Sequence, residues 1–311
     1  MARRLKCRHA AAVNSGTSAL HLALVALGVR PGDRVAMPSY VCSALLHAVD
    51  LAGAAPLLVD VDPATFNLDP DDLRKRLRSR TKAVIVPHMF GLPARFGDIE
   101  ACGVPIIEDC ALALGAKYGG RPVGSMGLLS IVSFYATKVI ATGEGGMVLT
   151  NRASLIREVR DRRSYDGRIH NRRRFNYKMT ELQAALGRVQ LRKLSFFLAR
   201  RRRLAALYAR VLSDGPWDLP SVEANHCFYR FVARSRRGTN RLLDELARRG
   251  IEARRPVFRP LHRCLGLEGF PGTEEAYRRA VSIPLYPALS SADAARVART
   301  TRLVGNLLAT S

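Results

Sequence analysis

Short runs of Val, Ile and Leu alternate with longer amphipathic stretches along the first 150 residues, and this alternation limits the fold more than any other feature. Such runs are typical of strands buried on both faces, and the helical periodicity between them is typical of helices that cover a parallel sheet. We therefore expect an α/β fold with a mostly parallel sheet flanked by helices. The expected strands are 34–37, 55–59, 83–86, 106–107, 131–134 and 147–149, and the expected helices are 18–27, 43–52 and 70–77.

The pattern changes in the second half of the chain. A long helical pattern begins at Thr180 and runs towards Val211, where Asp214-Gly215-Pro216 breaks it. A strand-like run at 228–232, a helix near 242–248 and a C-terminal helix from Ser291 follow. We expect two domains, a large one at 1–195 and a smaller α+β domain at 196–311.

The chain is strongly basic, with 50 Lys and Arg against 26 Asp and Glu and a formal net charge of +24. Nucleic-acid binding is one interpretation of such an excess. The excess is nearly all arginine on expected helical faces, as at 200–203, and no zinc finger or RNA-recognition signature accompanies it. We favour a solvated arginine-rich surface over a nucleic-acid site. A third interpretation is that part of the positive electrostatic field steers a polyanionic small substrate into the active-site cleft.

The sequence also bears on the compartment. No apolar run approaches the roughly 20 residues that a bilayer span needs, so we expect no membrane segment. The basic N-terminus lacks the apolar middle of a signal peptide, because Asn14-Ser15-Gly16 comes too early. The six cysteines form no Cys-x-x-Cys pair and have no histidine at metal-ligand spacing. We expect a cytoplasmic protein with reduced cysteines and no metal site.

Two charged side chains follow expected strands. Lys138 comes after the strand that ends near Phe134 and before the turn Gly143-Glu144-Gly145-Gly146, where a lysine is well placed to hold an aldehyde cofactor as a Schiff base. Asp109 ends an earlier strand, at the edge where ligands of open α/β sheets bind, and can keep a pyridine nitrogen protonated. Glu108 points to the opposite face, so the role falls to Asp109.

A possible phosphate site lies upstream of these residues. Ser15-Gly16-Thr17-Ser18 begins an expected helix, and free N–H groups at a helix N-terminus bind anions. Ser133 can supply a further hydroxyl. Taken alone, the first motif reads as an ordinary N-cap and Ser133 as a strand-end serine. Together with Lys138 and Asp109 they predict pyridoxal phosphate (PLP) as cofactor.

Several motifs in one order carry a resemblance that covers nearly the whole chain. They lie at 14–24, 31–33, 38–40, 108–109, 133–138, 143–146, 176–187, 260–262 and 282–287. On these residues the chain resembles the DegT/DnrJ/StrS family of sugar aminotransferases. The resemblance implies the aspartate aminotransferase fold (PLP transferase fold type I) with a seven-stranded type of sheet.

The resemblance also implies roles for single residues. Lys138 matches the Schiff-base lysine and Asp109 the partner of the pyridine nitrogen. The phosphate cup matches Gly16, Thr17, Ser18 and Ser133. Asn176 matches an asparagine that reaches the phosphate of the neighbouring subunit, which implies a homodimer with shared active sites. The implied substrates are a nucleotide-linked keto-sugar, or less often a cyclitol ketone, with glutamate or glutamine as amino donor.

Three features depart from the family pattern. Leu112 stands where the family has a glutamine that contacts the cofactor ring and its phenolic oxygen, and Cys42 stands where many members stack an aromatic ring on the cofactor. We expect both residues still to contact the cofactor, because sulfur and leucine can pack against a ring. The family usually has some tens of residues before the Ser-Gly-Thr motif, and the segment here is short.

Two alternatives to an aminotransferase stay open. A PLP-dependent sugar dehydratase would share the scaffold, but such enzymes replace the lysine with histidine, and Lys138 argues against it. A degenerate regulatory protein that binds DNA would explain Leu112 and the basic charge. The arginine-rich loop 168–174 is interpreted either as a contact for the substrate diphosphate or as a solvated loop.

Overall fold

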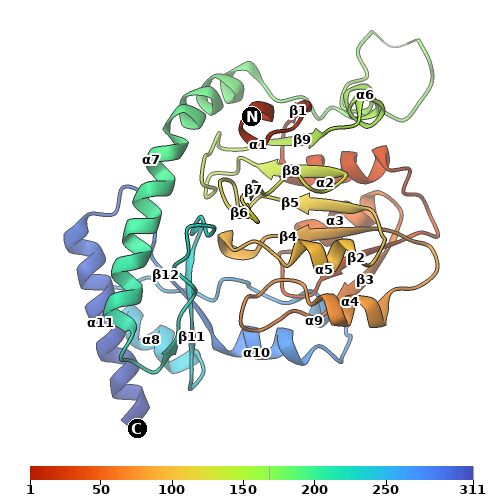
Figure 1. Ribbon diagram of the computed structural model, residues 1–311. Helices are drawn as coiled ribbons and strands as arrows, with labels where there is room; N and C mark the ends of the chain where they lie inside the picture. The colour runs from red at the N-terminus through yellow and green to blue at the C-terminus, as the bar shows by residue number, and fades with distance from the viewer. Residues whose placement is uncertain (168, 311) are drawn as a thin grey trace.

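A seven-stranded sheet forms the centre of the N-terminal part of the chain (Figure 1). The computed structural model describes all residues except 168 and 311. The strands, in the spatial order β1-β9-β8-β5-β4-β2-β3, are β1 (His9–Val13), β9 (Gly146–Thr150), β8 (Leu129–Ser133), β5 (Ile106–Asp109), β4 (Thr81–Pro87), β2 (Arg34–Pro38) and β3 (Ala55–Val59). β9 runs antiparallel to both of its neighbours, β1 and β8, and the five strands from β8 to β3 pair in parallel. The expected α/β fold is confirmed.

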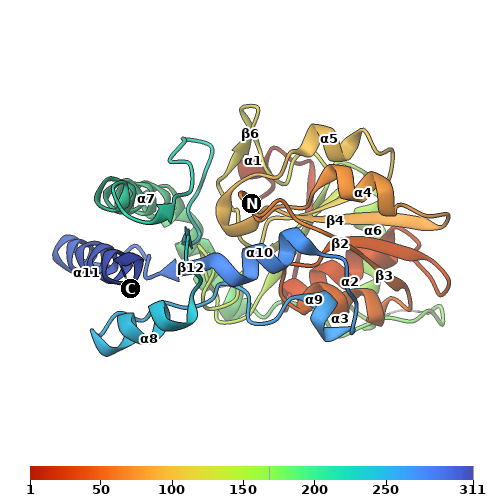
Figure 2. The ribbon, with the colours of Figure 1, turned by 90° about the horizontal axis from the view of Figure 1, so that it is seen from below.

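Helices cover both faces of this sheet, as Figure 2 shows. α2 (Gly16–Ala26), α3 (Ala44–Leu51) and α6 (Ala153–Arg162) pack on one face, and α4 (Pro70–Arg76) and α5 (Phe96–Glu100) on the other. Neighbouring side chains of β2 enter different cores: Val35 and Met37 pack with α2 and α3, and Ala36 packs with α4 and α5. Continuous apolar runs in the sequence therefore correspond to strands buried on both faces.

The sequence analysis missed β1. Its residues His-Ala-Ala-Ala-Val have little intrinsic preference for a strand. The segment becomes a strand because it pairs antiparallel with β9 along its whole length, from His9 opposite Thr150 to Val13 opposite Gly146. This pairing places the following turn, Ser15–Thr17, at the edge of the sheet where β8 ends.

The C-terminal part is built on a smaller sheet. The order β10 (Trp217–Asp218), β11 (Phe231–Ser235) and β12 (Ala280–Ile283) is antiparallel throughout. α8 (Asn240–Arg248) and α11 (Ser291–Thr310) pack on it together with the second half of α7 (Glu181–Leu212). α9 (Leu261–Cys264) and α10 (Pro271–Arg279) instead return to the large sheet. The remaining short elements are α1 (Ala2–Leu5), η1 (Met89–Gly91), β6 (Lys117–Tyr118) and β7 (Arg121–Pro122).

α7 joins the two parts as one uninterrupted helix, and the expected domain division at 195/196 falls inside it. Thr180 caps its start by accepting the N–H of Gln183, whose side chain in turn accepts the N–H of Thr180. The domain division stays a prediction.

The expectation of a solvated arginine cluster at 200–203 is wrong for Arg201. This side chain is 5% exposed, and its guanidinium donates to the carbonyls of Phe228, Tyr229 and Leu285 at 3.3, 2.9 and 3.1 Å. Arg202 donates to the carbonyl of His226 at 3.0 Å. Some of the excess arginines therefore hold loop carbonyls against α7 by hydrogen bonds, because a guanidinium offers several donors in one plane.

Strand β11 begins three residues later than the sequence indicated. Residues 228–230 form a loop that is tied to η1, since Cys227 N–H donates to the Gly91 carbonyl and Arg230 N–H to the Phe90 carbonyl. Phe228 has a φ of 50°. This loop brings Tyr229 and Arg230 towards the end of β8. All six cysteines are free. None of the helices described is long and apolar enough to cross a membrane.

Candidate active site

A cleft of about 900 Å³ lies between the loop that follows β8 and the C-terminal sheet. Lys138 lines it from the large-sheet side, and Tyr229, Arg230 and Arg254 line it from the other side. The Lys138 Nζ lies 5.3 Å from the centre of the Tyr229 ring, and the guanidinium of Arg230 lies 5.5 Å from it. Lys138 Nζ makes no hydrogen bond or ion pair with another described residue, so its amine is available for chemistry.

Tyr229 was missed by the sequence analysis, which assigned it to a strand. Burial opposes ionisation of its hydroxyl, but the charges of Lys138 and Arg230 and a hydrogen bond from Thr137 together lower its pKa. The Thr137 Oγ1 lies 3.2 Å from the Tyr229 hydroxyl. A tyrosine followed by an arginine, as in Tyr229-Arg230, is too common a pattern to single out without the structure.

Asp109 ends β5 with a buried carboxylate that is only partly bonded. Oδ1 accepts the N–H of Ala111 at 2.9 Å, and no other hydrogen bond to the carboxylate occurs within the described residues. Burial raises the pKa of Asp109, and the nearby charge of Lys138 only partly offsets this effect. A buried carboxylate with an unused oxygen needs a positively charged partner, which a protonated pyridine ring supplies. Asp109 therefore fits the role expected of it.

Glu108 points the other way, as the alternation along β5 predicts. Its oxygens accept N–H groups from Gly124, Met126 and Gly127 at 2.6–2.7 Å and lie 3.2 Å from His88 Nε2. His88 Nδ1 accepts the N–H of Ala94, so the ring proton lies on Nε2 and is donated to Glu108. Burial raises the pKa of Glu108, but these donors outweigh it and the net shift is downward.

Glu108, His88 and Cys110 together form a group whose ligand atoms lie within 4.8 Å of one another. A metal ion would have to displace the backbone N–H groups that Glu108 and His88 already bind. We interpret the group as a structural support of the loop before β8.

The start of α2 and the end of β8, which are expected to form the phosphate cup, lie in close contact. Gly16 begins α2 against the end of β8: a Cβ at this position would lie 2.8 Å from the Ser133 Cβ and 3.0 Å from its Oγ. Ser15 Oγ caps the helix by accepting the N–H of Ser18 at 3.0 Å, and the N–H groups of Gly16 and Thr17 have no acceptor among the described residues. Two open N–H groups beside a serine hydroxyl form the kind of anion site that PLP phosphate requires.

Cys42 and Leu112 lie near these groups. The Cys42 residue is exposed, but neighbouring protein atoms partly exclude water from its thiol, and this desolvation raises the pKa of the thiol. The Asp109 carboxylate raises the pKa of Cys42 further, and the charge of Lys138 lowers it. The thiol is thus near both expected catalytic residues. Leu112 is partly buried against two apolar cores, and its carbonyl accepts the thiol of Cys227 at 3.7 Å.

Asn176 has an exposed side chain. Its backbone carbonyl accepts the side-chain amide of Asn14 at 3.3 Å, and Asn14 N–H donates to the Tyr177 carbonyl at 2.9 Å. The main chain at 176–177 therefore lies beside the Ser15–Thr17 turn, while the Asn176 side chain is exposed.

The arginine-rich loop is partly engaged elsewhere. Arg172 pairs with Glu158 at 3.0 Å, and Arg174 pairs with Asp161 at 3.1 Å, both acids being on α6. Arg168 lies outside the described residues. The two paired arginines favour a structural role for this part of the loop.

The fold and the site together define a class of protein. The sheet is mostly parallel and has seven strands, with a lysine after β8, an aspartate at the end of β5 and an open helix N-terminus beside the end of β8. This arrangement is typical of PLP-dependent transferases of fold type I. A solved structure supports this: the aminotransferase TlmJ from Streptoalloteichus hindustanus superimposes with a TM-score of 0.93 and 31% identity over 100% of this chain and 89% of that one.

The family follows from the sequence comparisons. Residues 1–302 match the model of the DegT/DnrJ/EryC1/StrS aminotransferase family, and the chain belongs to that family. It is 37% identical to the GDP-perosamine synthase of Caulobacter vibrioides, over 93% of this chain and 84% of the relative. It is 34% identical to a pleiotropic regulatory protein of Geobacillus stearothermophilus, over 91% and 82%. The chain is a PLP-dependent aminotransferase, as its motifs predict.

Proposed function

We propose that the protein transfers an amino group from glutamate or glutamine to the carbonyl carbon of a nucleotide-linked keto-sugar, in the biosynthesis of a polysaccharide or a glycosylated natural product. The relative in C. vibrioides is named for such a product, GDP-perosamine. The observation that carries the proposal is the free Lys138 amine, which faces a cleft wide enough for a sugar and lined by Arg230 and Arg254.

PLP supplies an electron sink that stabilises negative charge on the carbon that loses a proton. Asp109 lies where its unused oxygen can hold the ring nitrogen protonated, because a buried carboxylate favours a cation beside it. Gly16 and Thr17 N–H groups and Ser133 Oγ bind the phosphate, with Ser18 in the same turn. Leu112 and Cys42 pack beside the ring.

Lys138 has two tasks. Its Nζ would hold the cofactor, and once released, the same Nζ would take the proton from the substrate carbon and return it. The aromatic ring of Tyr229 holds the amine at one side of the cleft by a cation–π contact. Arg230 lines the same cleft and offers its charge to the anionic groups of either substrate, whereas Arg254 is paired with Glu252.

The proposed assembly is a homodimer with shared sites. One face of α7 exposes four large apolar side chains, Leu182, Leu186, Val189 and Phe196, and Leu182 is 84% exposed. A stripe of this kind needs a partner surface. The family resemblance assigns Asn176 of a second copy to the phosphate cup of this one. We place the protein in the cytoplasm, where the six free cysteines stay reduced.

The experiment is a transfer assay with labelled donor. The PLP-loaded protein is incubated with α-¹⁵N-glutamate or α-¹⁵N-glutamine and a panel of nucleotide-linked keto-sugars, and the sugar products are analysed by mass spectrometry. We expect a ¹⁵N-amino sugar with at least one of them and none with Lys138→Ala. Absence of label in every product would contradict the proposal, and loss of water without nitrogen gain would favour the dehydratase.

The regulatory alternative has its own readout. The net charge and the regulatory relative motivate a DNA-binding test. We expect weak, sequence-independent binding that falls steeply as salt rises, as a basic surface gives any protein. Sequence-specific binding that survives physiological salt, without a spectral response of bound PLP to either amino donor, would favour the regulator.

A further inference from the structure

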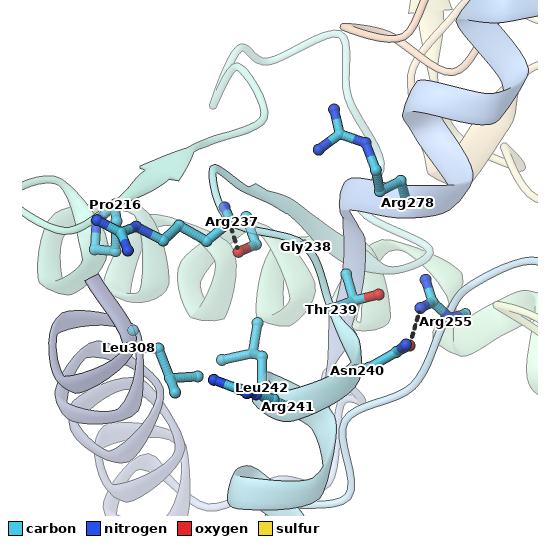
Figure 3. Close-up of a pocket in the computed structure, with 12 residues that line it drawn as sticks. Pro216, Arg237, Gly238, Thr239, Asn240, Arg241, Leu242, Arg255, Arg278 and Leu308 are labelled. Carbon is cyan, nitrogen blue, oxygen red and sulfur yellow. Dashed lines mark hydrogen bonds between the residues drawn. The ribbon is translucent and has the colours of Figure 1, made fainter. Parts of the chain in front are cut away.

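A second cavity, of about 340 Å³, lies in the C-terminal part of the chain (Figure 3). It is formed by the segment before α8, the start of that helix, the end of α10 and the last turns of α11. None of its lining residues lines the Lys138 cleft. The lining residues are Pro216, Ser235, Arg237, Gly238, Thr239, Asn240, Arg241, Leu242, Arg255, Arg278, Gly305 and Leu308.

Four arginines surround this cavity, and no Asp or Glu is among the described residues that line it. The guanidinium groups of Arg237, Arg241 and Arg278 form no ion pair or hydrogen bond with another described residue. Arg255 donates to the Asn240 side chain and to the Tyr277 carbonyl. Figure 3 shows Arg237 and Arg241 on the side of Leu308, and Arg255 and Arg278 on the other side of Thr239.

Two acids on the neighbouring elements already have partners. Asp218 on β10 pairs with Arg236 and Arg279, and Glu275 on α10 pairs with Arg279. The positive charge of the cavity is therefore not neutralised by these carboxylates, and it attracts an anion from solution.

Thr239 adds a second observation. It is the N-cap residue of the nine-residue helix α8 and is 3% exposed, yet its Oγ1 has no hydrogen-bond partner. In Figure 3 this oxygen projects from the segment towards the side of Arg255. A buried hydroxyl without a partner destabilises the folded protein unless a ligand satisfies it. The N–H groups of residues 240–242 also lack acceptors among the described residues. The helix start therefore offers unused donors beside the arginines.

The cavity is larger than a single phosphate needs. A water molecule occupies about 30 Å³ in the liquid, and small-molecule sites begin at about 300 Å³. Leu242, Leu308 and Pro216 give part of the wall an apolar character. The wall thus combines donors for phosphate oxygens with a surface for an uncharged organic group.

We propose that this cavity binds a nucleoside diphosphate at a site separate from the Lys138 cleft. The arginines on the two sides of Thr239 bind the two phosphates, Thr239 Oγ1 and the α8 N–H groups donate to the inner one, and the apolar wall holds the nucleoside. The proposal does not depend on the reaction assigned to the cleft.

Equilibrium binding to the PLP-loaded protein tests the proposal, with ADP and inorganic pyrophosphate as separate probes in a titration calorimeter. We expect saturable ADP binding that is tighter than that of pyrophosphate. Thr239→Val keeps the shape of the side chain and removes the hydroxyl, and Arg241→Gln removes one charge. Each should weaken ADP binding about tenfold, the effect of losing one hydrogen bond to a charged group. Arg299→Gln, an exposed α11 arginine outside the cavity, is the charge-matched control and should leave binding unchanged.

A second readout separates a lost ligand contact from damaged structure. The melting temperature of Thr239→Val without ADP should equal or exceed that of the wild type, because the variant removes an unbonded buried hydroxyl. Its transamination rate should be unchanged. No saturable ADP binding, equal affinity for pyrophosphate and ADP, or equal ADP affinity in Thr239→Val and wild type would each overturn the proposal.

Discussion

Gly16 lies against Ser133 so closely that a Cβ at residue 16 would meet the Ser133 Cβ at 2.8 Å. The two residues come from α2 and from β8, so the start of the helix is pressed onto the end of the strand that precedes Lys138. This contact holds the open N–H groups of the α2 turn beside the Ser133 hydroxyl. The phosphate cup therefore depends on the absence of a side chain at residue 16.

Gly16→Ala is expected to push the two elements apart and to weaken PLP binding. Overpacking of this kind costs about 1–3 kcal/mol, or about tenfold in affinity. The PLP dissociation constant is measured by absorbance. Wild-type PLP affinity in Gly16→Ala would contradict the assignment of this turn.

Asp109→Asn should leave PLP bound but slow transamination by several orders of magnitude, because a neutral amide cannot keep the ring nitrogen protonated. The measurement is kcat/KM with a reactive keto-sugar. A loss of less than about tenfold would mean that another group does this work.

The stability of the Asp109→Asn variant gives an independent check. Burial raises the pKa of Asp109, so the native state holds a proton that the unfolded chain has lost as pH rises above 3.8. The free energy of unfolding of the cofactor-free protein therefore falls as pH rises from 3.8 to the pKa of Asp109 in the folded state. Above that pKa the loss of stability is complete. Without PLP, the asparagine variant should melt higher than wild type at pH 7, and added PLP should stabilise it less.

His226 should make the folded protein less stable at acid pH. Burial lowers its pKa from 6.5 to about 4, and its ring stacks on Phe228 with centroids 3.7 Å apart. Below pH 6.5 the unfolded chain binds a proton that the native state does not, so stability falls until about pH 4, by about 3 kcal/mol. The free energy of unfolding, measured with denaturant across this pH range, should no longer fall in His226→Gln. It should still fall in His47→Gln, where the histidine is exposed on α3.

Arg201→Met should destabilise the protein by about 3 kcal/mol, because three buried carbonyls lose a charged donor. The control is Arg203→Met, since Arg203 is exposed on the same helix. Denaturant midpoints measure both. Equal midpoints would show that Arg201 is the solvated residue that the sequence indicated.

The parallel sheet could be predicted from the sequence because its strands are buried on both faces, so that each one is a run of Val, Ile and Leu. Asp109 and Lys138 could be singled out with the sheet, since Asp109 ends β5 and Lys138 lies five residues after the end of β8. β1 could not be predicted from its alanines, because its strand conformation depends on pairing with β9, more than 130 residues away in the sequence.

Arg201 and Tyr229 show a second limit. A pattern of four arginines on a helix is the same whether a guanidinium meets solvent or loop carbonyls, and only the position of the 228–230 loop decides between them. That loop is held by η1 rather than by its own sequence. Likewise, the unbonded hydroxyl of Thr239 is visible only once the surroundings of α8 are known.

The most direct test of the account is the location of the cofactor on the chain. Lys138 Nζ makes no hydrogen bond or ion pair within the described residues, and its charge acts on the Asp109 carboxylate, so it should hold PLP as a Schiff base. Borohydride reduction of the yellow, PLP-loaded protein followed by peptide mapping should find the pyridoxyl label on Lys138. A label on a different lysine, or none after PLP has been added, would contradict the account.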